Sequence, residues 1–223
     1  MKFPKAVWAI LHKDLLNEKR SFVTLGSMLV FALIVILIFL FAFNLAAGLR
    51  KETASGVVWV TLCFAGTLSL ERTMALERES DGIDGLMLAP LDHTVIFIAK
   101  VLSNWCFMLV TAIIVIAAYA LFGNVSLFSP GFFGVIFLGT LGYILIGTLI
   151  ETLNLQIKSH GHLLSVLLFP LLIPLIMAAV NASTLILNGG DLLGLQTWMG
   201  ILTGYDLLFL AAGIMLYDKI LDE

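Results

Sequence analysis

The chain has 223 residues, of which 61% are hydrophobic and only 12% charged, with a formal net charge of −3 and a mean hydropathy of +1.08. Soluble domains carry about 25% charged residues. The composition therefore excludes a water-soluble globular protein and predicts a polytopic membrane protein.

The N-terminal segment is amphipathic. Trp8, Leu11 and Leu15 recur at helical spacing within residues 5–20, and charged residues occupy the rest of the helical wheel. This pattern predicts an interfacial helix over residues 1–21 that lies on the inner leaflet; a cytosolic helical leader is the alternative. The segment lacks the unbroken apolar stretch of a cleaved signal peptide, so we expect uncleaved insertion.

Six apolar runs follow, and each predicts a membrane-spanning helix, because a bilayer core of about 30 Å requires ~20 apolar residues. The second run is short and leads directly into Glu71 and Arg72, so we expect its helix to continue beyond the membrane. The sequence thus predicts an all-α membrane protein with a single transmembrane domain over residues 1–223. The predicted spans cover residues 22–46, about 56–70, 95–122, 132–150, 163–180 and 198–217, and the predicted outer loops cover 47–55, 123–131 and 181–197.

The basic residues predict the orientation. With the N-terminus inside, the inner segments hold ten of the 12 Lys and Arg residues, and only Arg50 and Lys51 lie outside. Cytoplasmic segments of membrane proteins carry an excess of Lys and Arg. Both termini are therefore predicted to be cytosolic.

Residues 71–94 form the main polar interruption of the chain and join the second and third spans. An apolar ridge at i, i+3 and i+4 suits docking into a groove on another protein, and acidic residues around it would steer the contact. We predict a cytosolic coupling helix that ends at a proline, followed by an aspartate that caps the next helix; a solvated charged loop is the alternative. The predicted coupling residues are Glu77, Arg78, Glu79, Gly82, Ile83, Gly85, Leu86, Met87, Pro90 and Asp92.

Two features inside the later spans need an explanation. Pro170 and Pro174 each remove a backbone hydrogen bond, which predicts a static kink, a hinge or a broken helix that lines a pathway. Asp206 is an ionisable residue within a span, and such residues default to a functional role. We expect Asp206 to face the interior of a dimer or a wet cavity, with Tyr205 nearby as an interfacial partner. In the alternative, the span begins later and Asp206 only caps it.

The fourth span is rich in glycine, which permits close helix contacts in lipid. Packing within the chain is the expected use, and a subunit interface is the alternative. The glycines are Gly131, Gly134, Gly139, Gly142 and Gly147.

Catalytic machinery is missing from the sequence. No Gly-x-x-x-x-Gly-Lys-Ser/Thr phosphate loop occurs, nor a Gly-x-Ser-x-Gly or His-Glu-x-x-His motif. His160 and His162 form a pair in an inner loop that could bind a metal or haem iron, but solvated loop histidines are commoner. We therefore expect no enzyme activity and no metal site.

The polar segment and several further motifs together resemble the haem-exporter B permeases of bacterial cytochrome c maturation, within the type-2 ABC exporter permeases. The resemblance covers essentially the full length. Beyond residues 77–92, the motifs that carry it are Lys13-Asp-Leu-Leu, Gly56-Val-Val-Trp-Val, Phe64-Ala-Gly, Phe169-Pro-Leu-Leu-Ile-Pro and Tyr205-Asp-Leu-Leu.

The resemblance implies a half-transporter of the bacterial inner membrane, with two copies of this chain and two copies of a separate ATP-binding subunit. It also implies a haem-handling membrane protein and a periplasmic haem chaperone as partners, and no nucleic acid. Haem is the implied cargo, or ATP drives release of the loaded chaperone. The alternatives are a type-2 exporter for a lipid, polysaccharide or drug, and a non-transporting membrane scaffold.

Overall fold

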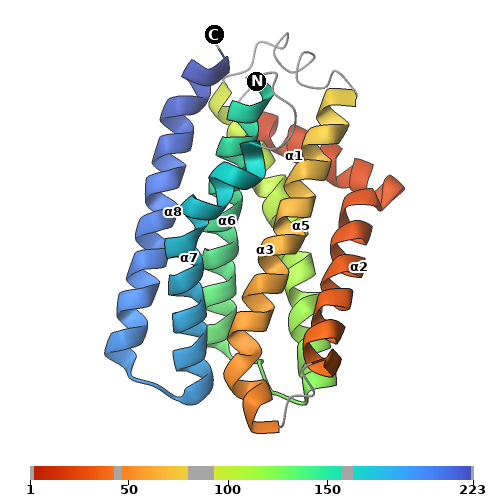
Figure 1. The fold of residues 1–223 in the computed structure, drawn as a ribbon. Helices are drawn as coiled ribbons and strands as arrows, with labels where there is room; N and C mark the ends of the chain where they lie inside the picture. The colour runs from red at the N-terminus through yellow and green to blue at the C-terminus, as the bar shows by residue number, and fades with distance from the viewer. Residues whose placement is uncertain (1–2, 43–46, 80–92, 157–162, 222–223) are drawn as a thin grey trace.

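The computed structural model of the chain describes residues 3–42, 47–79, 93–156 and 163–221, and these residues are helical apart from short connections. Figure 1 shows the helices as an upright bundle with one helix, α1, across one end. The elements are α1 (Phe3–Ser21), α2 (Val23–Leu37) continued by the π-helical turn η1 (Ile38–Ala42), α3 (Ala47–Glu79), α5 (His93–Gly123), α6 (Pro130–Gln156), α7 (Leu163–Asn188) and α8 (Leu192–Leu221).

Six helices within the described residues are long and apolar enough to cross a membrane, which confirms the predicted number of spans. The spans of α3 and α6 are each 72% buried, whereas that of α8 is only 17% buried. The core therefore lies between α3 and α6, and α2, α5, α7 and α8 surround it. The second helix continues past Glu71 to Glu79, as its short apolar run predicts.

Glycines on α6 allow close helix contacts in this core. At Gly139 a Cβ atom would collide with the indole of Trp59 on α3, and at Gly142 with the carboxyl group of Asp206 on α8. Trp59 also donates a buried hydrogen bond of 3.0 Å from Nε1 to Oγ of Ser183 on α7. These glycines pack against helices of the same chain, which is the expected use.

Two of the predicted outer loops are wrong. Residues 47–55 form the first turns of α3. Charged residues such as Arg50 are good helix formers, so the helix extends beyond the apolar run from which the span is predicted. Residues 181–197 are also mostly helical. The actual turn is Gly189 to Asp191: Gly189 has φ +67°, and the N–H of Gly190 donates to the carbonyl of Leu185 at 2.7 Å. Asp191 then caps α8 by accepting a hydrogen bond from the N–H of Leu193 at 3.2 Å.

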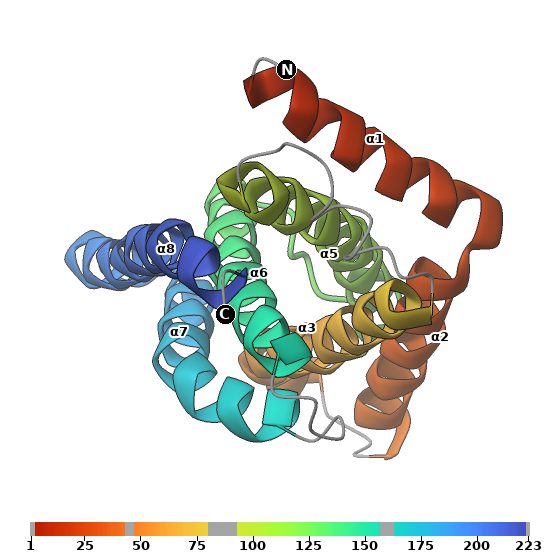
Figure 2. The same cartoon turned by 90° about the horizontal axis from the view of Figure 1, so that it is seen from above.

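The N-terminal helix α1 lies across the bundle end that also holds the C-terminal end of α8 (Figures 1 and 2). Its buried side presents Ala6, Val7 and Ile10, and it packs on α5. Trp8 points away and is 62% exposed. The helix is confirmed; of the predicted apolar stripe, Leu15 packs partly against the core, whereas Trp8 points away from the bundle.

Candidate functional site

The predicted coupling segment connects the end of α3 to the start of α5. Glu77, Arg78 and Glu79 form the last residues of α3, and α5 begins at His93. Both helix ends lie at the same end of the bundle as α1 and the last turn of α8 (Figure 1). The other predicted coupling residues lie outside the described residues: Gly82, Ile83, Gly85, Leu86, Met87, Pro90 and Asp92.

A polar contact ties α3 to α5 near this segment. The hydroxyl of Thr73, six residues before the end of α3, donates to Oδ1 of Asn104 on α5 at 3.2 Å. Asn104 is 1% exposed. The contact pairs the amide oxygen of Asn104 and ties together the two helices that carry the segment, while Nδ2 has no hydrogen-bond partner among the described residues.

An ion pair ties α5 to α1. Nζ of Lys100 lies 3.3 Å from Oδ2 of Asp14, and the hydroxyl of Ser103 donates to the same oxygen at 3.2 Å. The side chains of Lys100 and Asp14 are only 9% and 15% exposed. Lys13 also approaches Asp14, at 3.4 Å, but is half exposed. The Lys100 pair is therefore the contact that anchors α1 on the bundle.

Glu18 forms the elbow between α1 and α2. Its carboxylate is buried and accepts a hydrogen bond of 2.6 Å from the backbone N–H of Leu25, in the first turn of α2. Phe22 between the two helices has φ 50°, and its N–H donates to the carbonyl of Glu18 at 2.8 Å. A carboxylate at a helix N-terminus satisfies a free N–H group and complements the helix dipole. The direction of α1 relative to α2 is thus fixed by named contacts.

No role for Lys100, Asp14 or Glu18 is predicted from the sequence. A usable signal was present, because Lys100 lies inside the predicted third span, where an unpaired charge is expensive. Its partner, 86 positions earlier, follows only from the packing of α1 on α5.

Asp206 lies deep within α8, 14 residues after its first residue, so it does not cap the helix. It is 6% exposed, and its carboxyl group rests on Gly142 of α6. Neither carboxyl oxygen has a hydrogen-bond partner among the residues that the structure describes. The expected pairing with Tyr205 is wrong, because that hydroxyl donates to the carbonyl of Leu171 on α7 at 3.3 Å.

Asp206 is one of the residues around a cavity of about 410 Å³ between α5, α6 and α8, but both of its carboxyl oxygens are themselves inaccessible. The lining is apolar apart from Asp206 and Thr203. The apolar lining residues are Phe97, Ile98, Val101, Leu102, Leu138, Leu141, Leu145, Leu207 and Leu210.

A second cavity of about 400 Å³ lies near the first residues of α3, between η1 and α7. It is lined by more polar residues, including Glu52, Thr53, Ser55 and Thr184. Oγ of Ser55 and Oγ1 of Thr184 are hydrogen-bonded at 2.6 Å. The buried Ser55 hydroxyl is thus satisfied within the chain, in contrast to the carboxyl group of Asp206.

The two prolines lie within α7, which continues through both of them. A broken helix at this position is therefore wrong. Pro170 and Pro174 are exposed on the surface of the bundle, and α7 follows a curved path around α6 (Figure 2). A hinge at this pair stays a prediction.

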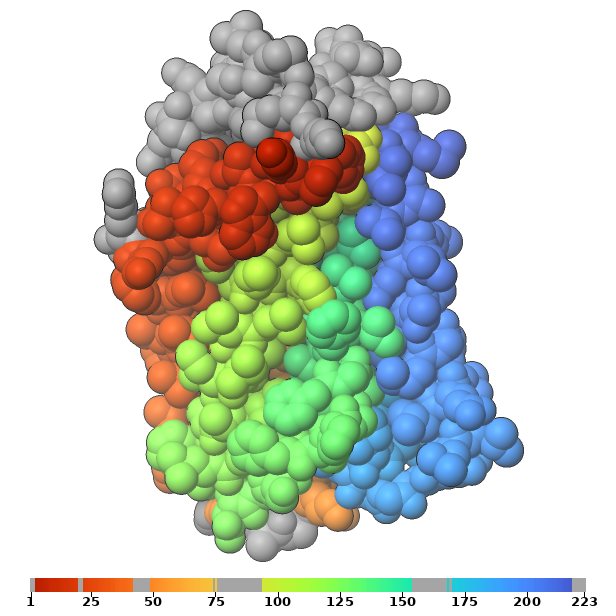
Figure 3. Space-filling view, turned by 180° about the vertical axis from the view of Figure 1, so that it is seen from behind, coloured from red at the N-terminus to blue at the C-terminus, as the bar shows by residue number. Residues whose placement is uncertain are grey.

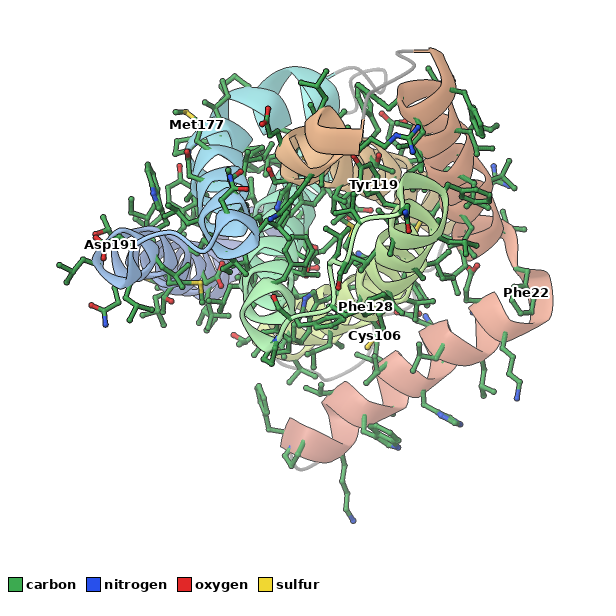
Figure 4. All side chains as sticks on the ribbon, turned by 90° about the horizontal axis from the view of Figure 1, so that it is seen from below. Phe22, Cys106, Tyr119, Phe128, Met177 and Asp191 are labelled. Carbon is green, nitrogen blue, oxygen red and sulfur yellow. The ribbon has the colours of Figure 1, made fainter. Side chains whose placement is uncertain are left out.

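Metal-binding groups are not assembled in the part of the chain that the structure describes: it contains no cluster of three His, Cys, Asp or Glu side chains. Cys63 and Cys106 are both free thiols on different helices. Figure 4 shows Cys106 on the side of α5 that faces α1. His160 and His162 lie outside the described residues.

Comparison with known proteins gives one consistent result. The model of the family described as "CcmB protein" matches residues 5–215. Heme exporter protein B of Pseudomonas aeruginosa is 30% identical over 180 residues, which cover 80% of this chain and 81% of that protein. The protein of the same name from Rhodobacter capsulatus is 28% identical over 200 residues, 88% of this chain and 89% of that protein. The Escherichia coli K12 protein is 28% identical over 178 residues, with 78% and 80% covered.

Proposed function

Because the chain belongs to the CcmB protein family, we propose that it is the transmembrane permease subunit of an ABC transporter complex for c-type cytochrome biogenesis. The family match over residues 5–215 is the observation that carries this conclusion. It also confirms the resemblance to the haem-exporter B permeases. The name of the relatives, heme exporter protein B, supports haem as the cargo exported to the periplasm. The alternative within the same pathway is that ATP hydrolysis drives release of a haem chaperone.

ATP hydrolysis belongs to a separate subunit in this proposal. The sequence has no phosphate-binding loop of the Gly-x-x-x-x-Gly-Lys-Ser/Thr form. Two copies of this chain would pair with two copies of that ATP-binding subunit. Residues 71–94 would dock on it, with the apolar ridge of Ile83, Leu86 and Met87 in a groove and Glu77, Arg78 and Glu79 on the rim.

The contacts at this end of the bundle provide a route by which a movement of residues 71–94 would reach neighbouring helices. The segment joins α3 to α5, and Thr73 and Asn104 link these helices directly. Movement of α5 would pass to α1 through Lys100 and Asp14. The Glu18 elbow would then pass it to α2. Four helices would respond to one docking event, as a permease driven from outside requires.

The proposed orientation places both termini in the cytosol of a bacterium and the chain in its inner membrane. The distribution of basic residues supports this, because ten of the 12 fall in the inner segments. α1 would then lie along the inner leaflet with the exposed Trp8 at the lipid interface. The short turn at Gly189–Asp191 leaves little chain outside to hold haem, so a haem-handling membrane protein and a periplasmic chaperone would perform that step.

Affinity purification of the full chain from mildly solubilised native membranes tests this function, combined with c-type cytochrome content in a deletion strain. Recovery of an ATP-binding subunit together with haem-maturation proteins, and loss of c-type cytochromes on deletion, are the expected results. An ATP-binding subunit with normal cytochrome content would mean another cargo. Failure to recover any ATP-binding subunit would overturn the permease assignment.

A further inference from the structure

The outward face of α1 has no role in the proposed coupling. α1 lies beside the end of the bundle: Figure 2 shows it outside the ring of helices and alongside α5, and Figure 3 shows it across the outer surface of α5. It packs on α5 through Ala6, Val7 and Ile10. The opposite side of α1 therefore faces away from the rest of the chain, at the edge of the bundle.

Both acidic residues of α1 are turned toward the bundle, where other helices pair them. Asp14 lies 3.3 Å from Lys100 of α5, and its side chain is 15% exposed. Glu18 is buried and accepts its hydrogen bond from the N–H of Leu25 on α2. No other Asp or Glu occurs in α1. The outward face therefore carries no carboxylate from its own helix.

Basic side chains occupy that outward face. Lys5, His12 and Lys19 recur at i, i+7 and i+14, which places them in one stripe because an α-helix has about 3.6 residues per turn. All three are exposed. Lys13 lies beside the stripe and is half exposed, although it also approaches Asp14 at 3.4 Å. The folded helix thus separates its charges, with the carboxylates toward the bundle and the cations outward.

Apolar side chains border the basic stripe on one flank. Trp8 is 62% exposed, and its indole stacks on the imidazole of His12 with ring centroids 6.2 Å apart. Leu11 and Leu15, on the same flank, are half-buried. Tryptophan is enriched at the boundary between hydrocarbon and water. Because α1 packs against the side of a spanning helix, this flank and the stripe beside it suit the layer of lipid headgroups around the bundle.

We propose that the outward face of α1 is a binding surface for anionic phospholipid headgroups, which it prefers over zwitterionic ones. Anionic lipids attract basic residues held at the membrane surface. They would hold α1 at that surface, while the pair of Asp14 and Lys100 holds it on α5. This inference rests on the placement of α1 at a membrane surface in the proposed function, and not on the cargo or on coupling to an ATPase. The residues of the surface are Lys5, Trp8, His12, Lys13 and Lys19.

Two exposed positions allow a matched test of lipid preference. Ala9 lies on the outward face, four residues from both Lys5 and Lys13. Leu121, near the other end of α5, is 76% exposed and has no charged residue three or four positions away. A benzophenone amino acid is placed at each position in turn in the full-length chain. The protein is reconstituted into vesicles of phosphatidylcholine with a minor share of phosphatidylglycerol, irradiated, and its lipid adducts are quantified by mass spectrometry.

The expected result is a phosphatidylglycerol-to-phosphatidylcholine adduct ratio about fivefold higher from Ala9 than from Leu121. Replacing Lys5, Lys13 and Lys19 together by Gln should bring the Ala9 ratio down to that of Leu121. Lys51→Gln, an exposed lysine in the first turns of α3, is the control and should leave the Ala9 ratio unchanged.

Salt provides the same test in a chain with all its lysines. Raising the ionic strength from about 0.1 M to about 1 M shortens the Debye length from about 10 Å to about 3 Å, so the Ala9 excess should fall. This comparison decides if the triple variant does not accumulate. Equal ratios from Ala9 and Leu121, or an Ala9 excess that neither salt nor the triple variant lowers, would overturn the proposal.

Irradiation of the Ala9 variant in its native membrane identifies what covers this face there. Adducts on anionic lipids are expected. Adducts only on another protein would overturn the proposal, because a protein surface would then cover α1. The vesicles carry the same lipids in both leaflets, and no readout involves cytochrome content or ATP turnover. A failure here is therefore distinguishable from a failure of the proposed function.

Discussion

Lys100 and Asp206 are both ionisable residues inside spanning helices, but they differ in whether the chain supplies a partner for them. Lys100, near the end of the bundle that carries α1, is paired with Asp14 at 3.3 Å. Asp206, near the middle of α8, is equally buried but has no hydrogen-bond partner among the described residues. An unpaired charge in hydrocarbon is costly. The contrast is therefore between an ionisable residue that the chain pairs by itself and one that it leaves without a hydrogen-bond partner among the described residues.

The two regions also differ in burial and in the number of polar ties. Three separate polar contacts, Thr73 with Asn104, Ser103 with Asp14 and Leu25 with Glu18, tie together α1, α2, α3 and α5. α8 is mostly exposed, and several of its large apolar side chains, such as Leu207, Leu208 and Met215, face outward.

The largest expected effect concerns the glycine under Asp206. In Gly142→Leu the new side chain would collide with Asp206 and with Cδ1 of Leu175, which lies only 2.7 Å from an added Cβ. Overpacking of this kind costs about 3 kcal/mol. The unfolding free energy in mixed micelles should fall by that amount, while Gly200→Leu, where an added Cβ meets no described atom within 4 Å, should leave it nearly unchanged. Equal losses in both variants would contradict the described packing.

The paired region is tested by comparing two lysines that approach the same carboxylate. Lys100→Met leaves Asp14 poorly hydrated and without its buried cation, so we expect a loss of about 2 kcal/mol of unfolding free energy. Lys13→Met removes a half-exposed lysine and should cost at most about 0.5 kcal/mol. The double variant of Asp14→Asn with Lys100→Met should recover part of the loss. Similar costs for the two lysines would remove the claim that Lys100 anchors α1.

The elbow at Glu18 has a smaller expected effect. Glu18→Ala removes the acceptor of the Leu25 N–H group, which should cost about 1 kcal/mol. Hydrogen exchange should show faster exchange in the first turn of α2 and in α1, relative to the exposed-site control Lys19→Ala. Unchanged exchange at Leu25 would show that the carboxylate does not cap α2.

Asp206 should give the smallest change, and one of opposite sign. In the purified full-length chain, Asp206→Asn removes a buried carboxylate that has no described partner, so the unfolding free energy should stay unchanged or rise by up to about 1 kcal/mol. A loss comparable to that of Lys100→Met would mean that the chain pairs Asp206 internally, and the comparison between the two residues would fail.

The sequence predicted the elements of this fold better than their ends. Apolar runs identify six spans because ~20 apolar residues suffice to cross the bilayer. They do not mark where a helix stops, so the turn at Gly189 and the cap at Asp191 both fall within the predicted loop 181–197. Asn188-Gly-Gly-Asp191 carries that signal locally, since glycine adopts the left-handed conformation and aspartate caps helices.

The candidate site was predictable only in part. Asp206 stands out in the sequence because it is charged within an apolar run, and the structure places it in the middle of a helix. Asp206 does not pair with Tyr205, because adjacent residues on a helix point to different faces. The partners of Lys100 and Thr73 are 86 and 31 residues away. Such pairs are set by how the helices pack, which the pattern of a single segment does not contain.

The central claim, that residues 71–94 couple this permease to an ATPase, is tested most directly by ATP turnover of the purified complex. Gly85→Trp and the charge reversals Glu77→Lys and Glu79→Lys should insert and assemble at wild-type levels but lose the stimulation of ATP turnover by this chain. Gly200→Trp on α8, with an unobstructed Cβ position, is the matched control and should retain it. Wild-type stimulation in the Gly85→Trp and charge-reversed complexes would contradict the account.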